Sequence, residues 1–264
     1  LAGSKHLNNL AQLYMQDNNY RRTGEIALRV MRSRILVEKK RTKNTLNLNE
    51  QKLDNKDMAS LAQYEKLEGV VSLSLRNNQF DYHGGQDLAS SPYLKNLTSL
   101  NLMNNAVGDK GLLLLAESFN LSQLEYLNLE NTGITALGIL ALSQSPHLSR
   151  LKELNLSGND LREKGLRILA ESGNFKNLVK LRISGVPVGD SGFLALVHSN
   201  ILSQLEELEA MGNTITRKSL DSMTTASKLA RLKKLDLRRN KLKEADLIFL
   251  ADTPKFQALE ALRF

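Results

Sequence analysis

A short apolar pattern returns every 27 residues along most of this chain. One copy consists of Leu151, Leu154, Leu156 and Asn159. Copies of this spacing start at residues 43, 70, 97, 124, 151, 178, 205, 232 and 259, each 27 residues after the last. A fixed period of this length indicates stacked structural units that share a continuous core.

Each unit is predicted to contain one strand and one helix. The alternation of Leu154 and Leu156 is typical of a strand with one buried face. Later in the unit, Leu166, Leu169 and Ala170 recur at helical spacing. Neither element can bury its apolar side alone, so neighbouring units must stack. We expect the helix N-caps at four residues that precede such segments, namely Asp109, Thr135, Asp190 and Thr216.

The asparagine that follows each strand has a predicted structural role. Its amide both donates and accepts, so a buried Asn there can bond the backbone of the neighbouring turn. Gln51, Thr132 and Val186 replace it in three units. The predicted fold is therefore a curved right-handed α/β solenoid, a horseshoe with strands on its concave side. Residues 43–264 would form eight 27-residue repeats and the strand of a ninth, where a continuing chain or a short tail would cover the end.

These residues resemble a known family. The string Leu151-x-x-Leu154-x-Leu156-x-x-Asn159, followed by Gly165 to Ala170, resembles the ribonuclease-inhibitor-like leucine-rich repeats. The Gly-x-x-x-Leu-Ala ending is similar to the GALA-type repeats of bacterial effector proteins. The resemblance covers residues 43–264 and implies a protein partner on the concave face. Related proteins include enzyme inhibitors, scaffolds and effectors that bacteria deliver into host cells.

Residues 1–42 do not fit the repeat and are predicted to form a helical N-terminal cap or arm. They contain no Pro and nothing that reads as an F-box, so the ubiquitin-ligase role of some GALA-type effectors is not carried over. One short helix is expected around Leu7 to Tyr14, and a second from about Thr23 to Lys40. A cap would cover the first core face of the solenoid. The alternative is a basic helix that binds anionic lipid or nucleic acid, through Arg21, Arg22, Arg29, Arg32, Arg34, Lys39, Lys40, Arg41 and Lys43.

The net charge of +8 is carried by the two ends of the chain. Residues 1–43 and 217–243 hold ten basic side chains each, against three and two acidic ones. The 217–243 block contains no aromatic residue, which disfavours single-stranded nucleic acid as its ligand. The chain has no Cys, which fits a reducing compartment, and it has no apolar run of membrane-spanning length. The expected location is cytoplasmic, including the cytoplasm of a host cell after bacterial delivery.

Apparent catalytic motifs coincide with repeat positions. The string Gly189-Asp190-Ser191-Gly192 matches a serine-protease nucleophile motif, yet it occupies the same repeat positions as Gly108 to Gly111. The four histidines fall at different repeat positions and so form no evident cluster: His6, His83, His147 and His198. We therefore predict a non-enzymatic protein without a metal, a cofactor or a small-molecule substrate. The remaining alternative is a substrate-recognition arm of a larger enzyme or ubiquitin-ligase adaptor.

The strand positions that alternate with the buried leucines should face the concave side. Several of them are large or charged, and exposed Met, Tyr and Arg are favoured at protein interfaces. Charges alternate in sign across neighbouring strands, which is compatible with lateral ion pairing and equally with a charged docking surface. The predicted partner, a host protein or another bacterial protein, would contact Arg76, Met103, Tyr126, Glu130, Lys180, Arg182, Glu207, Glu209, Met211 and Lys234.

Overall fold

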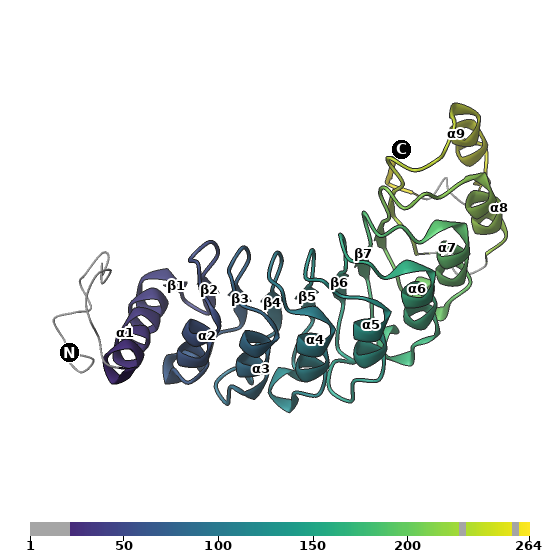
Figure 1. Ribbon diagram of the computed structural model, residues 1–264. Helices are drawn as coiled ribbons and strands as arrows, with labels where there is room; N and C mark the ends of the chain where they lie inside the picture. Colours follow the sequence, from purple (N-terminus) through teal and green to yellow (C-terminus); the bar gives the residue numbers. More distant parts are fainter. Residues whose placement is uncertain (1–21, 227–230, 255–258) are drawn as a thin grey trace.

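The chain forms an open arc of stacked strand-helix units (Figure 1). The computed structural model describes residues 22–226, 231–254 and 259–264. Strands line the inner side of the arc and helices cover its outer side (Figure 1). This arrangement is the predicted α/β solenoid with strands on the concave face.

A single sheet runs through the described part of the chain, with its strands in sequence order. The first two strands are antiparallel, and every later neighbour is parallel. Pairing joins residues that are 27 positions apart, such as Leu154 with Leu181, so the sheet register is the sequence period. The strands are β1 (Arg41–Thr42), β2 (Thr45–Asn47), β3 (Ser72–Ser74), β4 (Ser99–Asn101), β5 (Tyr126–Asn128), β6 (Glu153–Asn155), β7 (Lys180–Arg182), β8 (Glu207–Glu209), β9 (Lys234–Asp236) and β10 (Ala261–Arg263).

One helix follows each strand from β2 to β9, and one more precedes the sheet. The α-helices are α1 (Arg22–Lys40), α2 (Asn55–Ala62), α3 (Tyr82–Ser90), α4 (Gly108–Ala116), α5 (Ala136–Ser143), α6 (Arg162–Glu171), α7 (Gly189–Val197), α8 (Arg217–Thr225) and α9 (Glu244–Ala251). Among the described residues, short 3-10 turns follow α2, α4, α6 and α7, and they are η2 (Glu65–Leu67), η3 (Phe119–Leu121), η4 (Gly173–Phe175) and η5 (Asn200–Ser203). The predicted alternation of strand and helix is confirmed.

The pattern leucines form one continuous core between the sheet and the helices. Leu151, Leu154 and Leu156 are fully buried, and the same cluster extends from Val37 to Leu250. Burying one such side chain contributes about 1.5–3 kcal/mol. Because each unit shares this core with its neighbours, the solenoid is stabilised by contacts between units.

The asparagine ladder has the predicted role. Asn159 accepts hydrogen bonds from the backbone N–H groups of Thr132 and Ile134, and its amide donates to the carbonyls of Leu129 and Leu156. It thus joins two neighbouring turns. Where Val186 replaces the asparagine, the side chain is buried but carries no polar group.

Two of the four predicted N-caps are confirmed. Thr135 caps α5 and Thr216 caps α8 through their side-chain oxygens. The expectation for Asp109 and Asp190 was wrong, because both lie inside the first turn of their own helices, α4 and α7. The Asp109 carboxylate instead accepts from the backbone N–H and the hydroxyl of Thr135, at 2.8 and 2.6 Å.

Asp190 bonds Thr216 in the same way, at 2.9 Å to the backbone nitrogen and 2.6 Å to the hydroxyl. The unpaired N–H groups at a helix start attract a carboxylate. Because consecutive units stack, the aspartate of one unit lies at the start of the helix in the next unit. These aspartates therefore tie consecutive repeats together.

The helix predicted from about Thr23 to Lys40 is present as α1, which packs beside α2. The predicted helix around Leu7 to Tyr14 lies outside the described residues. Two α1 arginines reach the start of α2: Arg29 meets Asp54 at 2.7 Å, and Arg32 meets the buried Asp57 at 2.8 Å. These two basic side chains are therefore engaged within the molecule. Among the described helices, none is both long and apolar enough to cross a membrane.

Candidate binding surface on the inner sheet

The ten residues predicted to bind a partner lie on the inner strands or in the turns directly after them. Six are strand residues that flank buried leucines on β5 and β7 to β9. The other four follow strands β3, β4, β5 and β8 by two residues. Lys234 is exposed and the other nine are partly buried.

They form two groups separated by β6. Strands in a sheet are about 4.8 Å apart, so the outermost members of the set are roughly 30 Å from each other. One group surrounds β3 to β5 and contains Arg76, Met103, Tyr126 and Glu130. The other covers β7 to β9 and contains Lys180, Arg182, Glu207, Glu209, Met211 and Lys234.

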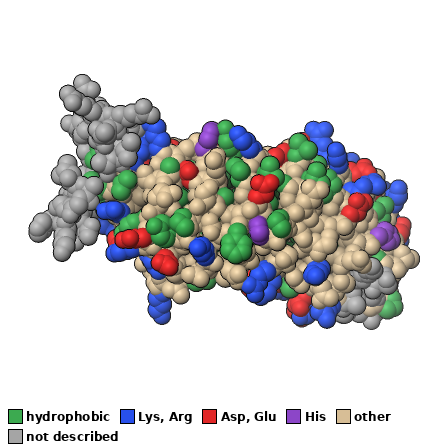
Figure 2. Space-filling model, turned by 90° about the horizontal axis from the view of Figure 1, so that it is seen from below, with side chains coloured by type: hydrophobic (Ala, Val, Ile, Leu, Met, Phe, Trp, Pro, Cys, Tyr) green, Lys and Arg blue, Asp and Glu red, His purple; other side chains and the backbone are tan. Residues whose placement is uncertain are grey.

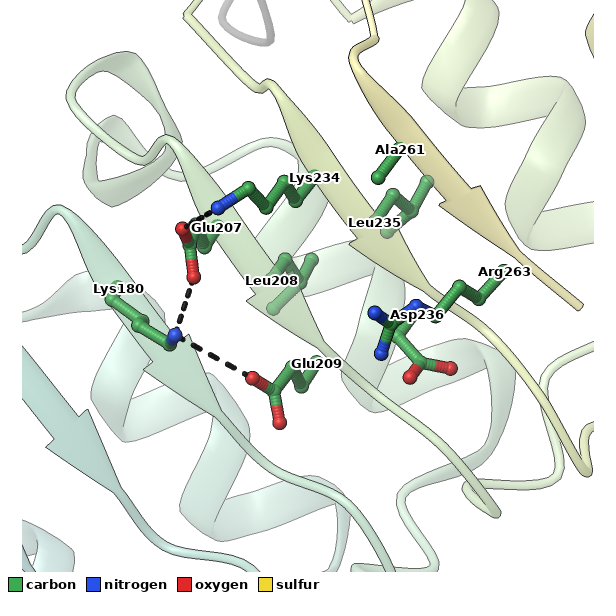
Figure 3. A pocket seen from close by; sticks show the side chains of 9 residues that line it. All are labelled: Lys180, Glu207, Leu208, Glu209, Lys234, Leu235, Asp236, Ala261 and Arg263. Carbon is green, nitrogen blue, oxygen red and sulfur yellow. Dashed lines mark hydrogen bonds and ion pairs between the residues drawn. The ribbon is translucent and has the colours of Figure 1, made fainter.

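Five residues of the second group form an ion-pair cluster, and Figure 3 shows all of them except Arg182. The Lys180 ammonium pairs with the carboxylate of Glu207 and lies 3.7 Å from that of Glu209. Lys234 meets Glu207 from the opposite side at 2.6 Å. Arg182 donates to Glu209 at 3.0 Å. We use the name ion-pair cluster for Lys180, Arg182, Glu207, Glu209 and Lys234.

Glu207 is the centre of this cluster. Hydrogen bonds from Lys180 and then from Lys234 lower the pKa of its carboxyl from 4.5 to about 2. The two lysines therefore hold Glu207 ionised at any physiological pH. The charge alternation in the sequence thus becomes lateral pairing across three strands.

The structure adds residues that the sequence-based selection left out. Glu153 lies 3.9 Å from Arg182, and Arg238 forms an ion pair with the carboxylate of Asp236 at 2.6 Å. Beside the cluster is a shallow pocket of about 200 Å³ whose lining includes Ala261 and Arg263 (Figure 3). Asp236 and Arg263 occupy the same repeat position as Arg182 and Glu209, and this position could have identified them from the sequence.

The group around β3 to β5 is built differently. Arg76 pairs with Glu50 at 2.7 Å, and Glu130 accepts from the Asn155 amide at 3.0 Å. The middle strand position holds asparagines, which are Asn101, Asn128 and Asn155 on β4 to β6. Each turns its side-chain oxygen back to the backbone N–H two residues later, at 3.0 Å. The middle strand position of this group is therefore uncharged, and its asparagine side chains are hydrogen-bonded to the backbone.

The residues of the apparent catalytic motifs have structural partners. Asp190 holds the start of α8, as described above. His83 lies 2.9 Å from Asp81, and the Phe119 and His147 rings meet edge to face. His198 meets the hydroxyl of Ser222 at 2.8 Å. Within the described ranges, no three side chains of the metal-binding types come together. His6 lies outside the described residues.

The outer, helical face presents a mixed surface (Figure 2). Basic, acidic and apolar side chains alternate over it with no single large charged field in this view (Figure 2). Phe119 and Leu137 are its most exposed large apolar residues, at 70 % and 64 %. They provide an outer-face comparison for the inner surface.

Comparison with known proteins agrees with the fold. The family described as "Leucine Rich repeat" matches residues 93–116 and 147–170. The crystal structure of an internalin (inlF) from Listeria monocytogenes is similar, with a TM-score of 0.52 and 21% sequence identity over 79% of this chain and 50% of that one. The chain is thus an α/β leucine-rich-repeat solenoid. Proteins of this class are typically non-enzymatic scaffolds that bind other proteins.

Two further structures show weaker likeness. InlP of Listeria monocytogenes has a TM-score of 0.49 and 16% identity, over 80% of this chain and 51% of that one. A leucine-rich-repeat protein of Leptospira interrogans has a TM-score of 0.46 and 18% identity, over 94% of this chain and 58% of that one. The chain spans between half and three fifths of the length of these three bacterial proteins. No curated protein matches the sequence.

Proposed function

We propose that this chain is a non-enzymatic module that binds a partner protein on its concave face. The observation that supports this most strongly is the ion-pair cluster, which places five charged side chains on three adjacent strands of a rigid sheet. A surface that is already ordered loses little conformational entropy on binding. Partly buried Met103 and Tyr126 add apolar contact area on the same face.

The proposed contact residues are the ten that the sequence indicated. Truncation of an aromatic anchor such as Tyr126 typically costs about 2 kcal/mol of binding free energy. Charges at the edge of an interface act more on the association rate and on its salt dependence. Glu207 and Glu209 hold Lys180, Arg182 and Lys234 in place, so reversing their charges would break the ion pairs that order this surface. Tyr126 would hold the complex.

We further propose that the protein is a bacterial effector that acts in the host cytoplasm, where it inhibits or redirects a partner enzyme. The resemblance of residues 43–264 to GALA-type repeats supports this proposal. The similar fold of the internalin from Listeria monocytogenes, a bacterial protein, is compatible with this proposal. Fusion to a reporter enzyme that is active only in host cytoplasm tests delivery, and a silent reporter during infection would contradict it.

A partner captured from host or bacterial lysate allows the surface to be tested. Binding affinity is measured for Tyr126→Ala and for Glu207→Lys combined with Glu209→Lys. The matched outer-face controls are Lys164→Glu and Leu137→Ser, which alter one exposed charge and one exposed apolar side chain. We expect the inner changes to weaken binding and the controls to leave it unchanged. The reverse pattern would place the binding site on the helical face.

The basic N-terminal helix is less well suited to nucleic acid or lipid. Arg29 and Arg32 form ion pairs with Asp54 and Asp57, so part of its charge is neutralised within the molecule. We therefore favour a capping role for residues 1–42. A deletion variant that lacks them should unfold at a lower temperature, because the first turn of the core would be exposed to water.

A further inference from the structure

A row of long side chains ends at the last described strand. On β7, β8 and β9 the same strand position carries Lys180, Glu207 and Lys234. On β10 the equivalent residue is Ala261. Its single methyl group leaves open the pocket of about 200 Å³ beside Lys234 (Figure 3). Asp236 and Arg263, which are adjacent on β9 and β10, also line this space.

The acidic side chains around this pocket already have cationic partners. Glu207 forms ion pairs with Lys180 and Lys234, and Glu209 forms one with Arg182. Arg238 donates to both carboxylate oxygens of Asp236, at distances from 2.6 to 3.1 Å. No acidic group that lines the pocket is therefore left to attract a cation.

The basic side chains are less completely paired. Arg263 is exposed and has no ion pair within the part of the chain that the structure describes. It lies close enough to help lower the pKa of Asp236, but Arg238 occupies that carboxylate. Lys234 is half exposed and shares the Glu207 carboxylate with Lys180. Three basic and three acidic side chains line the pocket, and Arg182 and Arg238 bind two of the acidic ones from outside the lining. Glu260 lies close enough to Lys234 to raise its pKa. Arg263 is therefore the basic side chain at the pocket whose charge is least compensated.

We propose that this pocket receives an acidic side chain from the bound protein, held between the Lys234 ammonium and the Arg263 guanidinium. The planar guanidinium can donate two parallel hydrogen bonds to one carboxylate. The methyl group of Ala261 leaves the room that the incoming side chain needs. The partner segment is therefore acidic. This inference rests on the proposed concave-face function and assigns a partner chemistry to one end of that face.

The test uses a fluorescein-labelled hexaglutamate peptide, with the hexaglutamine peptide as its neutral counterpart. Fluorescence anisotropy gives the affinity of the intact chain for each at low and high salt. We expect the glutamate peptide to bind at least about tenfold more tightly, and the difference to shrink as salt screens the charges.

Three variants locate the site. Arg263→Gln should weaken binding of the glutamate peptide about tenfold, the usual effect of removing a hydrogen bond to a charged group. Ala261→Leu fills the pocket without changing charge and should cause a comparable loss. Lys164→Gln removes one positive charge from the outer face and should change the affinity less than about twofold, because a distant exposed charge is screened. Thermal melts by circular dichroism verify that each variant is folded.

Several outcomes would overturn the assignment. Equal affinity for the two peptides, or equal losses in Arg263→Gln and Lys164→Gln, would mean that no specific carboxylate site exists. If single-stranded oligothymidylate binds more tightly than hexaglutamate, and also depends on Arg263 and Ala261, the pocket recognises phosphate instead. Because the peptide assay needs no natural partner, its failure leaves the Tyr126 and Glu207 test of the concave face intact, and the reverse also holds.

Discussion

The inner sheet has two halves that use the same strand position in opposite ways. On β4 to β6 this position is Asn101, Asn128 and Asn155, and each side chain bonds its own backbone. On β7 and β8 it is Arg182 and Glu209, which pair with each other across the strands. In the first half the polar side chains are hydrogen-bonded to the backbone. In the second half they pair with each other at the surface, where a charged group of a partner can replace one member of an ion pair.

The buried ladder is interrupted in both halves, by Thr132 after β5 and by Val186 after β7. The Asn159 side chain, in the turn after β6, bonds five backbone groups, whereas the Val186 side chain bonds none. Asn213 and Asn240 continue the ladder after β8 and β9. Substitutions of the asparagines should therefore act on folding stability, with little dependence on salt or acid. The charged half should respond to pH and salt, and its substitutions should act mainly on binding.

The largest effect is expected in the buried ladder. Asn159→Ala removes five hydrogen bonds and leaves buried backbone groups without partners, which should lower the free energy of unfolding by about 3 kcal/mol. Urea denaturation measures this change. The matched control is Val186→Ala at the equivalent position, which removes two buried methyl groups and no hydrogen bond and should cost about 1.5 kcal/mol. Similar losses in the two variants would show that the ladder amide contributes little beyond its volume.

The next effect is the acid sensitivity of the charged half. The pKa of Glu207 is lowered from 4.5 to about 2 by Lys180 and Lys234, so the folded state favours its ionised form. The resulting stability is fully present above pH 4.5 and is lost as the pH falls from 4.5 through about 2. We expect the loss to be on the order of 2 kcal/mol, less than the full linkage value because the pair is partly exposed to solvent.

Urea unfolding at a series of pH values measures this slope. Glu207→Gln should flatten it. Asn128→Ala, on the neutral half, should keep the acid slope of the unchanged protein. If the free energy of unfolding of Glu207→Gln falls with acid as steeply as that of the unchanged protein, other carboxyl groups cause the acid sensitivity.

A smaller effect is expected from the surface asparagines. Asn128→Ala removes one hydrogen bond to the backbone N–H of Glu130 and should cost about 1 kcal/mol of unfolding free energy. This loss should be the same at low and high salt, because no net charge changes. A strongly salt-dependent loss would mean that Asn128 acts through its charged neighbours.

The smallest effect on stability is expected at the equivalent position on β7. Arg182→Ala breaks two partly exposed ion pairs, with Glu209 and with Glu153. Such exposed pairs typically contribute about 0–1 kcal/mol. The effect of Arg182→Ala should shrink further at high salt, as screening weakens the pairs. Affinity for the partner should nevertheless fall in this variant. A stability loss as large as that of Asn159→Ala would remove the distinction between the two halves.

The sequence by itself determined the fold because its information is periodic. A spacing of 27 residues places equivalent side chains on neighbouring strands, so the buried leucines, the ladder asparagines and the inward-facing positions could be predicted from one repeat. Six of the ten candidate residues lie on strands beside buried leucines, as the spacing predicts, and the other four lie in the turns two residues after a strand.

The tertiary structure alone decided which of these side chains are engaged. Asp109 was expected to cap its own helix and instead binds Thr135 in the next repeat. Arg263 resembles other basic residues in the sequence, yet it borders a pocket because Ala261 is short and Arg238 already holds Asp236. Repeats are 27 residues apart in sequence but about 5 Å apart in the sheet. Side-chain pairing depends on that short distance and on the length and rotamer of each neighbour, which the repeat period does not encode.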